Sequence, residues 1–404
     1  MELLGNLGGG FAIAITWQNL LLALLGCFLG TIMGALPGLG PINGVAILLP
    51  IAYGLGFQPE SALILLAGIY YGAEYGGRIS SIMLNIPGDE PAMMTCLDGY
   101  PMAQKGRAGE ALALSGVASF VGAFFATWGL VLLAPQLVKV ALLFGPAEYF
   151  ALAVLGITAI ASIGGGSLIK GLIAGLLGLA VALIGLDPLT GVARFTFGNM
   201  MLLTGVSFIA AIIGIFALAE VLQRFADGPP KGEQMAQVST QLPSLAEFLA
   251  TKITLLRSSV IGTIIGALPG VGATTAAFIS YSEAFRWSRR PELFGKGSAE
   301  GIAAPEAGNN SAVGGSMIPL LALGIPGGAA TAVLLAAFSF HNIIGGPSFI
   351  RNQTDIVYSI ILGNLGQVVL LAVIGLLGLF LPNLLLNLLL IVPLQEVGLA
   401  LSTS

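Results

Sequence analysis

Two short proline-glycine motifs recur in this 404-residue sequence, and they are the positions best suited to binding small ions. They are Leu36-Pro37-Gly38 with Leu268-Pro269-Gly270, and Ile86-Pro87-Gly88 with Ile325-Pro326-Gly327. Proline followed by glycine interrupts a helix and frees backbone N–H and C=O groups. Freed N–H groups at a helix start attract anions, and freed carbonyls suit Na⁺. Kinks or tight turns are the alternative interpretation, which suits one isolated motif better than four in a repeated order.

Polar residues around these breaks extend the candidate site. Arg78 either pairs with an anionic substrate or pairs with Glu74 one helical turn earlier, and the sequence leaves both open. The predicted substrate-binding residues are Pro37, Gly38, Gly40, Asn43, Gly77, Arg78, Ser80, Asn85, Pro87, Gly88, Pro269, Gly270, Thr274, Thr275, Pro326 and Gly327.

Acidic and amide side chains offer a separate site for a cation. Glu306, Asn309 and Asn310 have the i, i+3, i+4 spacing of one helical face. Oxygen ligands of this kind suit a hard cation, so we predict that these residues bind a coupling ion. A polar contact between helices is the alternative. Asp89 and Glu90 are expected to cap the helix that follows them.

The remaining reactive residue types argue against an enzyme. Cys27 and Cys96 lie in apolar runs without metal-ligand spacing, and His341 is the only histidine. No phosphate-binding Walker loop or Gly-x-Ser-x-Gly nucleophile motif is present. We therefore expect no catalytic residues, no metal centre and no cofactor other than a coupling Na⁺ or H⁺.

The elements that carry these residues must cross a lipid bilayer. Only 8% of the residues are charged and 56% are hydrophobic, whereas soluble proteins carry about 25% charged residues. Residues 3–59, 307–350 and 356–395 contain no charge at all, and such runs indicate membrane spans. This composition excludes a soluble enzyme, a nucleic-acid-binding protein and a disordered chain. Continuous apolar runs predict an all-α multi-pass protein rather than a β-barrel, with separate spans near 61–76 and 79–96.

The chain contains an internal repeat. Residues 30–40 and 262–272 are identical at nine of eleven positions, and the two Ile-Pro-Gly motifs lie 239 residues apart. Paired broken segments in two related halves are typical of a transporter binding site. The predicted organisation is a first membrane half, 1–222, with repeat 1 around 16–110 and further spans at 111–222; a polar linker, 223–257; and a second membrane half, 258–404, with repeat 2 around 258–350.

The distribution of basic residues predicts that the repeats have inverted topology. In the first half, the loop at 54–60 between the breaks has no Lys or Arg, and Lys105 and Arg107 follow the second break. In the second half, four basic residues lie between the breaks at 286–296, and only Arg351 follows. Loops rich in Lys and Arg stay cytoplasmic, so the bias changes sides between the halves.

Longer motifs resemble the large membrane subunit of the tripartite tricarboxylate transporter family. The resemblance runs from about residue 10 to about residue 350. The motifs that carry it are Gly34-Ala-Leu-Pro-Gly-Leu-Gly-Pro41, Tyr70-Tyr-Gly-Ala-Glu-Tyr-Gly-Gly77, Asn85-Ile-Pro-Gly88, Asp98-Gly-Tyr-Pro101, Gly165-Gly-Ser167, Phe195-Thr-Phe-Gly198, Ala304-Pro-Glu306 with Asn309-Asn310, and Leu323-Gly-Ile-Pro-Gly327.

The resemblance implies a multi-pass protein of the bacterial inner membrane. In that family the large subunit forms the pathway, works with a small membrane subunit, and receives substrate from a periplasmic solute-binding protein. It further implies uptake of citrate or another small carboxylate, driven by an ion gradient, by an elevator-like mechanism. A channel-type anion pathway is the alternative. Family members usually extend further beyond the second repeat, so we expect a C-terminal portion to be missing.

Overall fold

A computed structural model describes residues 2–145, 168–186, 192–206 and 242–380, with short pieces between 147 and 222. Three sequence predictions fall outside the described residues. These are the first part of the linker (223–241), the Gly165-Gly-Ser167 motif, and the chain beyond residue 380.

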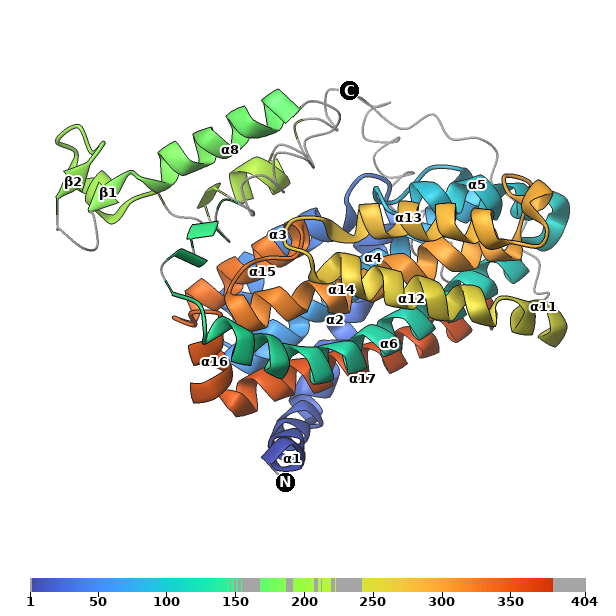
Figure 1. Ribbon diagram of the computed structural model, residues 1–404, viewed down its shortest axis with the longest axis horizontal. Helices are drawn as coiled ribbons and strands as arrows, with labels where there is room; N and C mark the ends of the chain where they lie inside the picture. The colour runs from blue at the N-terminus through green and yellow to red at the C-terminus, as the bar shows by residue number, and fades with distance from the viewer. Residues whose placement is uncertain are drawn as a thin grey trace, which may run out of the picture.

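The described chain is almost entirely helical (Figure 1). The first half contains α1 (Glu2–Ala14), α2 (Trp17–Ala35), α3 (Gly40–Gly54), α4 (Pro59–Leu84), α5 (Met93–Met102), the π-helical turn η1 (Ala103–Arg107) and α6 (Ala108–Ala141). Then come α8 (Leu168–Ala182), the two-residue strands β1 (Gly185–Leu186) and β2 (Ala193–Arg194), η2 (Met200–Thr204) and η3 (Ile213–Leu218). The strands pair antiparallel, with Gly185 opposite Arg194. The second half contains α11 (Leu245–Ala250), α12 (Lys252–Ala267), α13 (Gly272–Trp287), η4 (Pro291–Leu293), α14 (Ala299–Leu323), α15 (Ala329–Phe340), α16 (Pro347–Asn352) and α17 (Thr354–Phe380).

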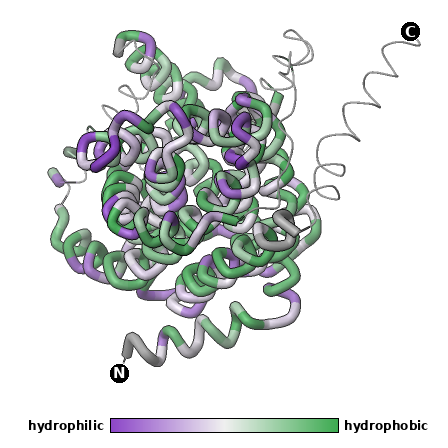
Figure 2. The backbone as a smooth tube through the Cα atoms, turned by 90° about the vertical axis from the view of Figure 1, so that its right-hand side faces the viewer, coloured by the Kyte–Doolittle hydropathy of each residue, from purple (hydrophilic) through white to green (hydrophobic). Residues whose placement is uncertain are grey.

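Three stretches of the described chain are long and apolar enough to cross a membrane: Trp17–Ala35, Met93–Ala141 and Thr354–Gly375. Shorter apolar helices accompany them at Gly40–Gly54, Ile169–Ala182 and Ala329–Phe340. Seen from one end, hydrophobic segments run around the outside of the bundle, and hydrophilic segments gather at the end facing the viewer (Figure 2). These features fit an all-α protein that passes through the membrane several times.

The centre of the molecule is formed by its two most polar long helices, α4 and α14. Every residue is buried from 61 to 78 in α4 and from 301 to 322 in α14. Polar residues are tolerated at membrane depth when protein surrounds them, which explains why these helices occupy the middle of the bundle.

Glycines let α2 and α4 approach closely. A Cβ at Gly30 of α2 would lie 2.9 Å from the Cα of Ile69, and a Cβ at Gly72 of α4 would lie 2.9 Å from the nitrogen of Thr31. This is the small-residue packing of membrane helices. The second half repeats it between α12 and α14, where a Cβ at Gly315 would lie 3.1 Å from the Cα of Thr263.

This packing explains why the prediction of separate spans at 61–76 and 79–96 is wrong. The single helix α4 runs from Pro59 to Leu84 without a break at Gly76-Gly77. A Cβ at Gly76 would lie 2.9 Å from the nitrogen of Ala35, so this glycine allows contact with α2 and does not end the helix.

The two halves exchange long helices. The helix α6, which follows repeat 1, packs along α14 of the second half, and α17, which follows repeat 2, packs against α4 and α6. Gly122 of α6 adjoins Ala307, and a Cβ at Gly363 of α17 would lie 2.9 Å from Ile64. Each central helix is therefore covered by a helix from the opposite half.

Candidate functional site

The Leu-Pro-Gly motifs separate α2 from α3 and α12 from α13. Gly38 and Gly270 have φ angles of 80° and 78°, and Gly40 and Gly272 have φ angles of 57° and 74°. Residues with a side chain rarely adopt these angles, so glycine is needed at each position. The same backbone path thus interrupts both halves.

The Ile-Pro-Gly motifs follow the ends of α4 and α14. Asn85 and Gly324, the residues just past these ends, have φ angles of 56° and 71°. The next N–H groups turn back to the helix: Ile86 donates to the carbonyl of Ser80 at 3.5 Å, and Ile325 donates to that of Pro319 at 3.3 Å. A left-handed residue with a returning hydrogen bond is a common helix stop, and asparagine tolerates that conformation better than most residues.

Within each half the two breaks are joined by backbone hydrogen bonds. In the first half, the Gly38 N–H donates to the Gly88 carbonyl at 3.0 Å. In the second, the Gly270 N–H donates to the Pro326 carbonyl at 3.3 Å, and the Gly272 N–H donates to the Gly327 carbonyl at 3.2 Å. Predicted residues that lie fifty or more positions apart in sequence therefore share one junction in each half.

Glycine is also required inside these junctions. A Cβ at Gly88 would lie 2.6 Å from the Cα of Gly77 and would overlap the carbonyl of Gly34. A Cβ at Gly327 would lie 2.6 Å from the Cα of Ser316. The junction of each half therefore packs directly against two helix backbones, those of α2 and α4 in the first half and those of α12 and α14 in the second.

Contacts between the halves occur beside the junctions. The Thr274 hydroxyl donates to the Glu90 carboxylate at 3.2 Å. The helices α3 and α15 also pack together, and at their ends farthest from the breaks the rings of Tyr53 and Phe340 stack at 4.2 Å. Residues that follow a break in one half thus touch residues that follow a break in the other.

Other predicted side chains bind local backbone instead. The amide of Asn43 donates to the Gly38 carbonyl at 3.5 Å. The Ser80 hydroxyl donates to Gly77 at 3.3 Å, and the Thr275 hydroxyl donates to Val271 at 3.2 Å. These three side chains therefore stabilise the ends of their own helices.

Arg78 is directed towards α6. Its Nη1 donates to the Leu112 carbonyl at 2.9 Å and to the Ser115 hydroxyl at 2.5 Å, and its guanidinium lies 3.7 Å from the ring centre of Tyr75. Among the described residues it makes no ion pair with Glu74, so that alternative is wrong. Contact between Arg78 and an anionic substrate stays a prediction.

Glu306 is fully enclosed and hydrogen-bonded. Thr95 donates to one carboxylate oxygen at 2.5 Å, and Ser119 donates to the other at 2.9 Å. The amide of Asn310 donates to the main-chain carbonyl of Glu306 at 3.0 Å, whereas Asn309 adjoins Glu74. The three predicted coupling-ion residues therefore have different surroundings, although they share a helical face.

The two acidic residues after Gly88 also differ. Asp89 accepts from the N–H of Ala92 at 2.9 Å in the turn before α5, but α5 begins without a side-chain capping hydrogen bond, so the predicted capping by this residue is wrong. Glu90 instead accepts from Thr274 of the other half.

Sequence reasoning missed Asp98, which lies completely buried on α5. Its carboxylate accepts from the N–H groups of Gly297 and Ser298 at 2.9 and 2.7 Å, and from the Tyr281 hydroxyl at 2.9 Å. Nearby, the Lys105 ammonium donates to the Lys296 carbonyl at 2.5 Å. The basic loops of the two halves therefore meet at the same end of the molecule. The Asp98-Gly-Tyr-Pro motif was visible in the sequence, but its partners lie nearly 200 residues away.

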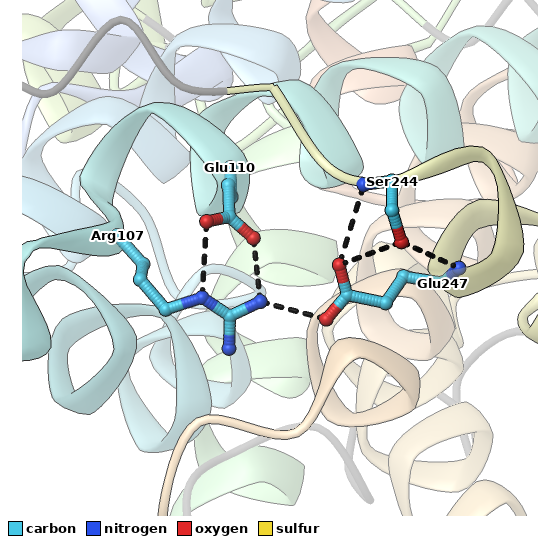
Figure 3. A network of polar contacts seen from close by, with 4 residues as sticks. All are labelled: Arg107, Glu110, Ser244 and Glu247. Carbon is cyan, nitrogen blue, oxygen red and sulfur yellow. Dashed lines mark hydrogen bonds and ion pairs between the residues drawn. The ribbon is translucent and has the colours of Figure 1, made fainter.

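The described part of the predicted linker, 242–257, contains α11 and the first turns of α12. A network of polar contacts on the surface joins α11 to the start of α6 (Figure 3). The Arg107 guanidinium forms ion pairs with Glu110 at 2.5 Å and Glu247 at 2.7 Å. Ser244 and Glu247 also form a capping box at the start of α11. Partial burial acts to raise the pKa of Glu247, but hydrogen bonds from Arg107 and Ser244 outweigh it and hold that pKa below its usual value.

An apolar cavity of about 390 Å³ lies between α4, α6, α11 and α17, away from the breaks. Its lining includes Tyr75, Gly116, Phe248 and Gly375, and a Cβ at Gly116 would lie 3.0 Å from the Arg78 guanidinium. A second cavity, of about 470 Å³, lies between α6 and α16. Neither cavity is lined by a break residue.

Comparison with known proteins identifies relatives. The chain is 42% identical, over 93% of its length and 76% of the relative, to an uncharacterized 52.8 kDa protein in the TAR-I ttuC' 3' region of Agrobacterium vitis. It is 43% identical, over 28% of its length and 50% of the relative, to an uncharacterized protein in the TAR-II ttuC' 3' region of the same organism. No solved structure matches.

The sequence profile of one family covers nearly the whole chain. The family is described as the tripartite tricarboxylate transporter TctA family, and its profile matches residues 20–393. Both junctions, both central helices and the Asp98 contacts lie within this range. The chain belongs to the tripartite tricarboxylate transporter TctA family.

Proposed function

We propose that this chain is the large membrane subunit of a binding-protein-dependent secondary transporter that takes up small carboxylates, such as citrate, using an ion gradient. Its partners are a small membrane subunit and a periplasmic solute-binding protein, and its location is the bacterial inner membrane. The observation that carries the proposal is the pair of equivalent junctions, in which Gly38 binds Gly88 and Gly270 binds Pro326.

The helix starts at the junctions support carboxylate binding. The helices α3, α13 and α15 begin at the breaks, and each lacks a charged residue in its first turn. A helix start carries a partial positive charge and unpaired N–H groups, which stabilise a carboxylate without a charged side chain. Arg78, whose donors face α6, is not needed for this mode of binding.

The proposal includes inverted repeats and elevator-like alternating access. The meeting of Lys105 with Lys296 supports the inversion, because the basic loop lies after the breaks in one half and between them in the other. If such loops stay cytoplasmic, this end of the molecule faces the cytoplasm.

Uptake into proteoliposomes tests the proposal. The chain is reconstituted with its small membrane subunit, supplied with the binding protein, and given labelled citrate under an imposed Na⁺ or pH gradient. We expect accumulation above the outside concentration only with a gradient, together with counterflow of preloaded citrate. Flux that equilibrates citrate without counterflow indicates a channel-type pathway, and accumulation independent of both gradients refutes ion coupling.

A further inference from the structure

Glu74, in the middle of α4, is a buried carboxylate that forms no ion pair with any described residue. It is only 3% exposed, and its Oε2 has no hydrogen-bond partner in the part of the chain that the structure describes. Arg78, one turn later, donates to α6 and makes no ion pair with it. An isolated buried charge is costly, and inside a membrane it usually has a functional role.

The surroundings of Glu74 contain acceptor oxygens without donors. The amide nitrogen of Asn309 faces the Glu74 carboxylate, whereas the Oδ1 atoms of Asn309 and Asn310 are buried without partners among the described residues. The Oδ2 atom of Asp89 is also buried and unpartnered. Carboxylate and amide oxygens that lack donors are stabilised by a bound cation or by a proton.

Asp89 connects this cluster to the first-half junction. A Cβ at Gly77, one turn after Glu74, would lie 2.7 Å from the Oδ2 of Asp89, so Asp89 packs against the stretch of α4 that carries Glu74. Asp89 also follows Gly88, whose carbonyl accepts the hydrogen bond from Gly38. A cation that screens the two carboxylates from each other therefore acts directly on the position of the junction.

The other charged and titratable groups near Glu74 do not replace such a cation. Glu306 and Glu90 are carboxylates and add negative charge, and the Tyr70 hydroxyl contacts Ser316 at 3.3 Å. Glu306 differs from Glu74 because hydroxyl donors occupy both of its oxygens. Among the described residues, Glu74 and Asp89 are thus the buried carboxylates with acceptor capacity left for a ligand.

We propose that Glu74, next to Asn309 and Asp89, binds the monovalent coupling cation, either Na⁺ or H⁺. This inference rests on the proposed function and deepens it by placing the cation on α4, at its contact with α14. Glu306 then serves as a positioning residue that holds Thr95 of α5 and Ser119 of α6 against α14.

The test measures cation binding to the purified chain, without partners or substrate. Thermal unfolding in detergent is followed in NaCl and in choline chloride at equal ionic strength, and across a pH series in choline chloride. The wild type is expected to show a higher unfolding midpoint in NaCl if the ligand is Na⁺, or a pH-dependent midpoint if it is H⁺. Glu74→Gln is expected to lose the response to Na⁺, or to show a smaller pH dependence than the wild type if the ligand is H⁺.

Glu60→Gln is the matched control, because it makes the same change in the first turn of the same helix. It is expected to keep the full wild-type response. If Glu74→Gln does not fold, Asn309→Ala is measured in the same way and is expected to weaken the response.

A wild type that responds to neither cation overturns the proposal, and so does a Glu74→Gln response equal to that of the wild type. Citrate uptake is scored separately, so that failure of transport and failure of this site are distinguishable.

Discussion

The junction between the two breaks of each half should fail when a single methyl group is added. Gly88→Ala places a Cβ 2.6 Å from the Cα of Gly77 and 3.0 Å from its carbonyl oxygen, and also against the carbonyl of Gly34. Carbon atoms in contact normally lie about 3.5–4.0 Å apart. All of these neighbours are backbone atoms of α2 and α4, which cannot move aside as a flexible side chain can.

Overpacking in a well-packed interior costs about 1–3 kcal/mol, and the rigid surroundings place Gly88→Ala near the upper value. Gly327→Ala should cost a similar amount, because its Cβ would lie 2.6 Å from the Cα of Ser316 and 2.5 Å from the Gly266 carbonyl. A loss of about 3 kcal/mol should lower the unfolding midpoint of a chain of this length by roughly 3–4 °C.

Thermal unfolding of the purified chain in detergent checks this prediction. Gly54→Ala is the control, since nothing lies within 4 Å of a Cβ built at Gly54. Two alanine variants that unfold at the same temperature as Gly54→Ala would refute the reasoning, because the junctions would then have room that the geometry does not show.

Two further predictions concern contacts at the end of the molecule that carries the basic loops. Asp98→Ala leaves the N–H groups of Gly297 and Ser298 and the Tyr281 hydroxyl without their acceptor, so the chain should lose about 3 kcal/mol or more of unfolding free energy in a denaturation measurement. Glu283→Gln removes the charge of a partly exposed carboxylate that pairs with Arg286 at 3.9 Å, and it keeps a side-chain oxygen that can accept from the Trp287 Nε1. It should change stability by less than about 0.5 kcal/mol, and equal losses would contradict this ranking. Glu247→Gln should lower stability at pH 7 by about 0.2–1 kcal/mol, because the ion pair with Arg107 is partly exposed. The lowered pKa of Glu247 means that this contribution is present above the ordinary glutamate pKa and is lost as the pH falls through the lowered pKa. Variant and wild type should therefore converge once the pH lies below that lowered pKa. A difference that persists unchanged at acid pH would show that charge is not its source.

The breaks were readable from sequence because they depend on local chemistry. Proline removes a backbone donor and glycine permits positive φ, so Pro37-Gly38 and Pro269-Gly270 mark interruptions wherever the chain goes. Glycine alone is less informative. At Gly76 the missing side chain serves the contact with α2, and the helix continues through it.

Side-chain directions could not be obtained in this way. The i, i+4 spacing placed Arg78 within reach of Glu74, but the guanidinium donates to a carbonyl and a hydroxyl of α6 instead. Spacing also grouped Glu306 with Asn309. In the structure, Thr95 and Ser119 donate hydrogen bonds to the Glu306 carboxylate, whereas Asn309 lies beside Glu74. These outcomes depend on which helices pack around α4 and α14, and local periodicity carries no information about that packing.

The difference in length between the repeats bears directly on how the protein is oriented. Gly38 and Gly88 are fifty residues apart, whereas Gly270 and Gly327 are fifty-seven apart. The helices between the breaks have nearly equal lengths in the two halves, so the seven additional residues fall in the connecting loop, which is 55–58 in the first half and 288–298 in the second. That longer loop carries Arg289, Arg290 and Lys296, and its end is held by Asp98 of the other half. The insertion that distinguishes the repeats therefore supplies both the basic charge that favours one side of the membrane and the main-chain donors that join the halves at that side.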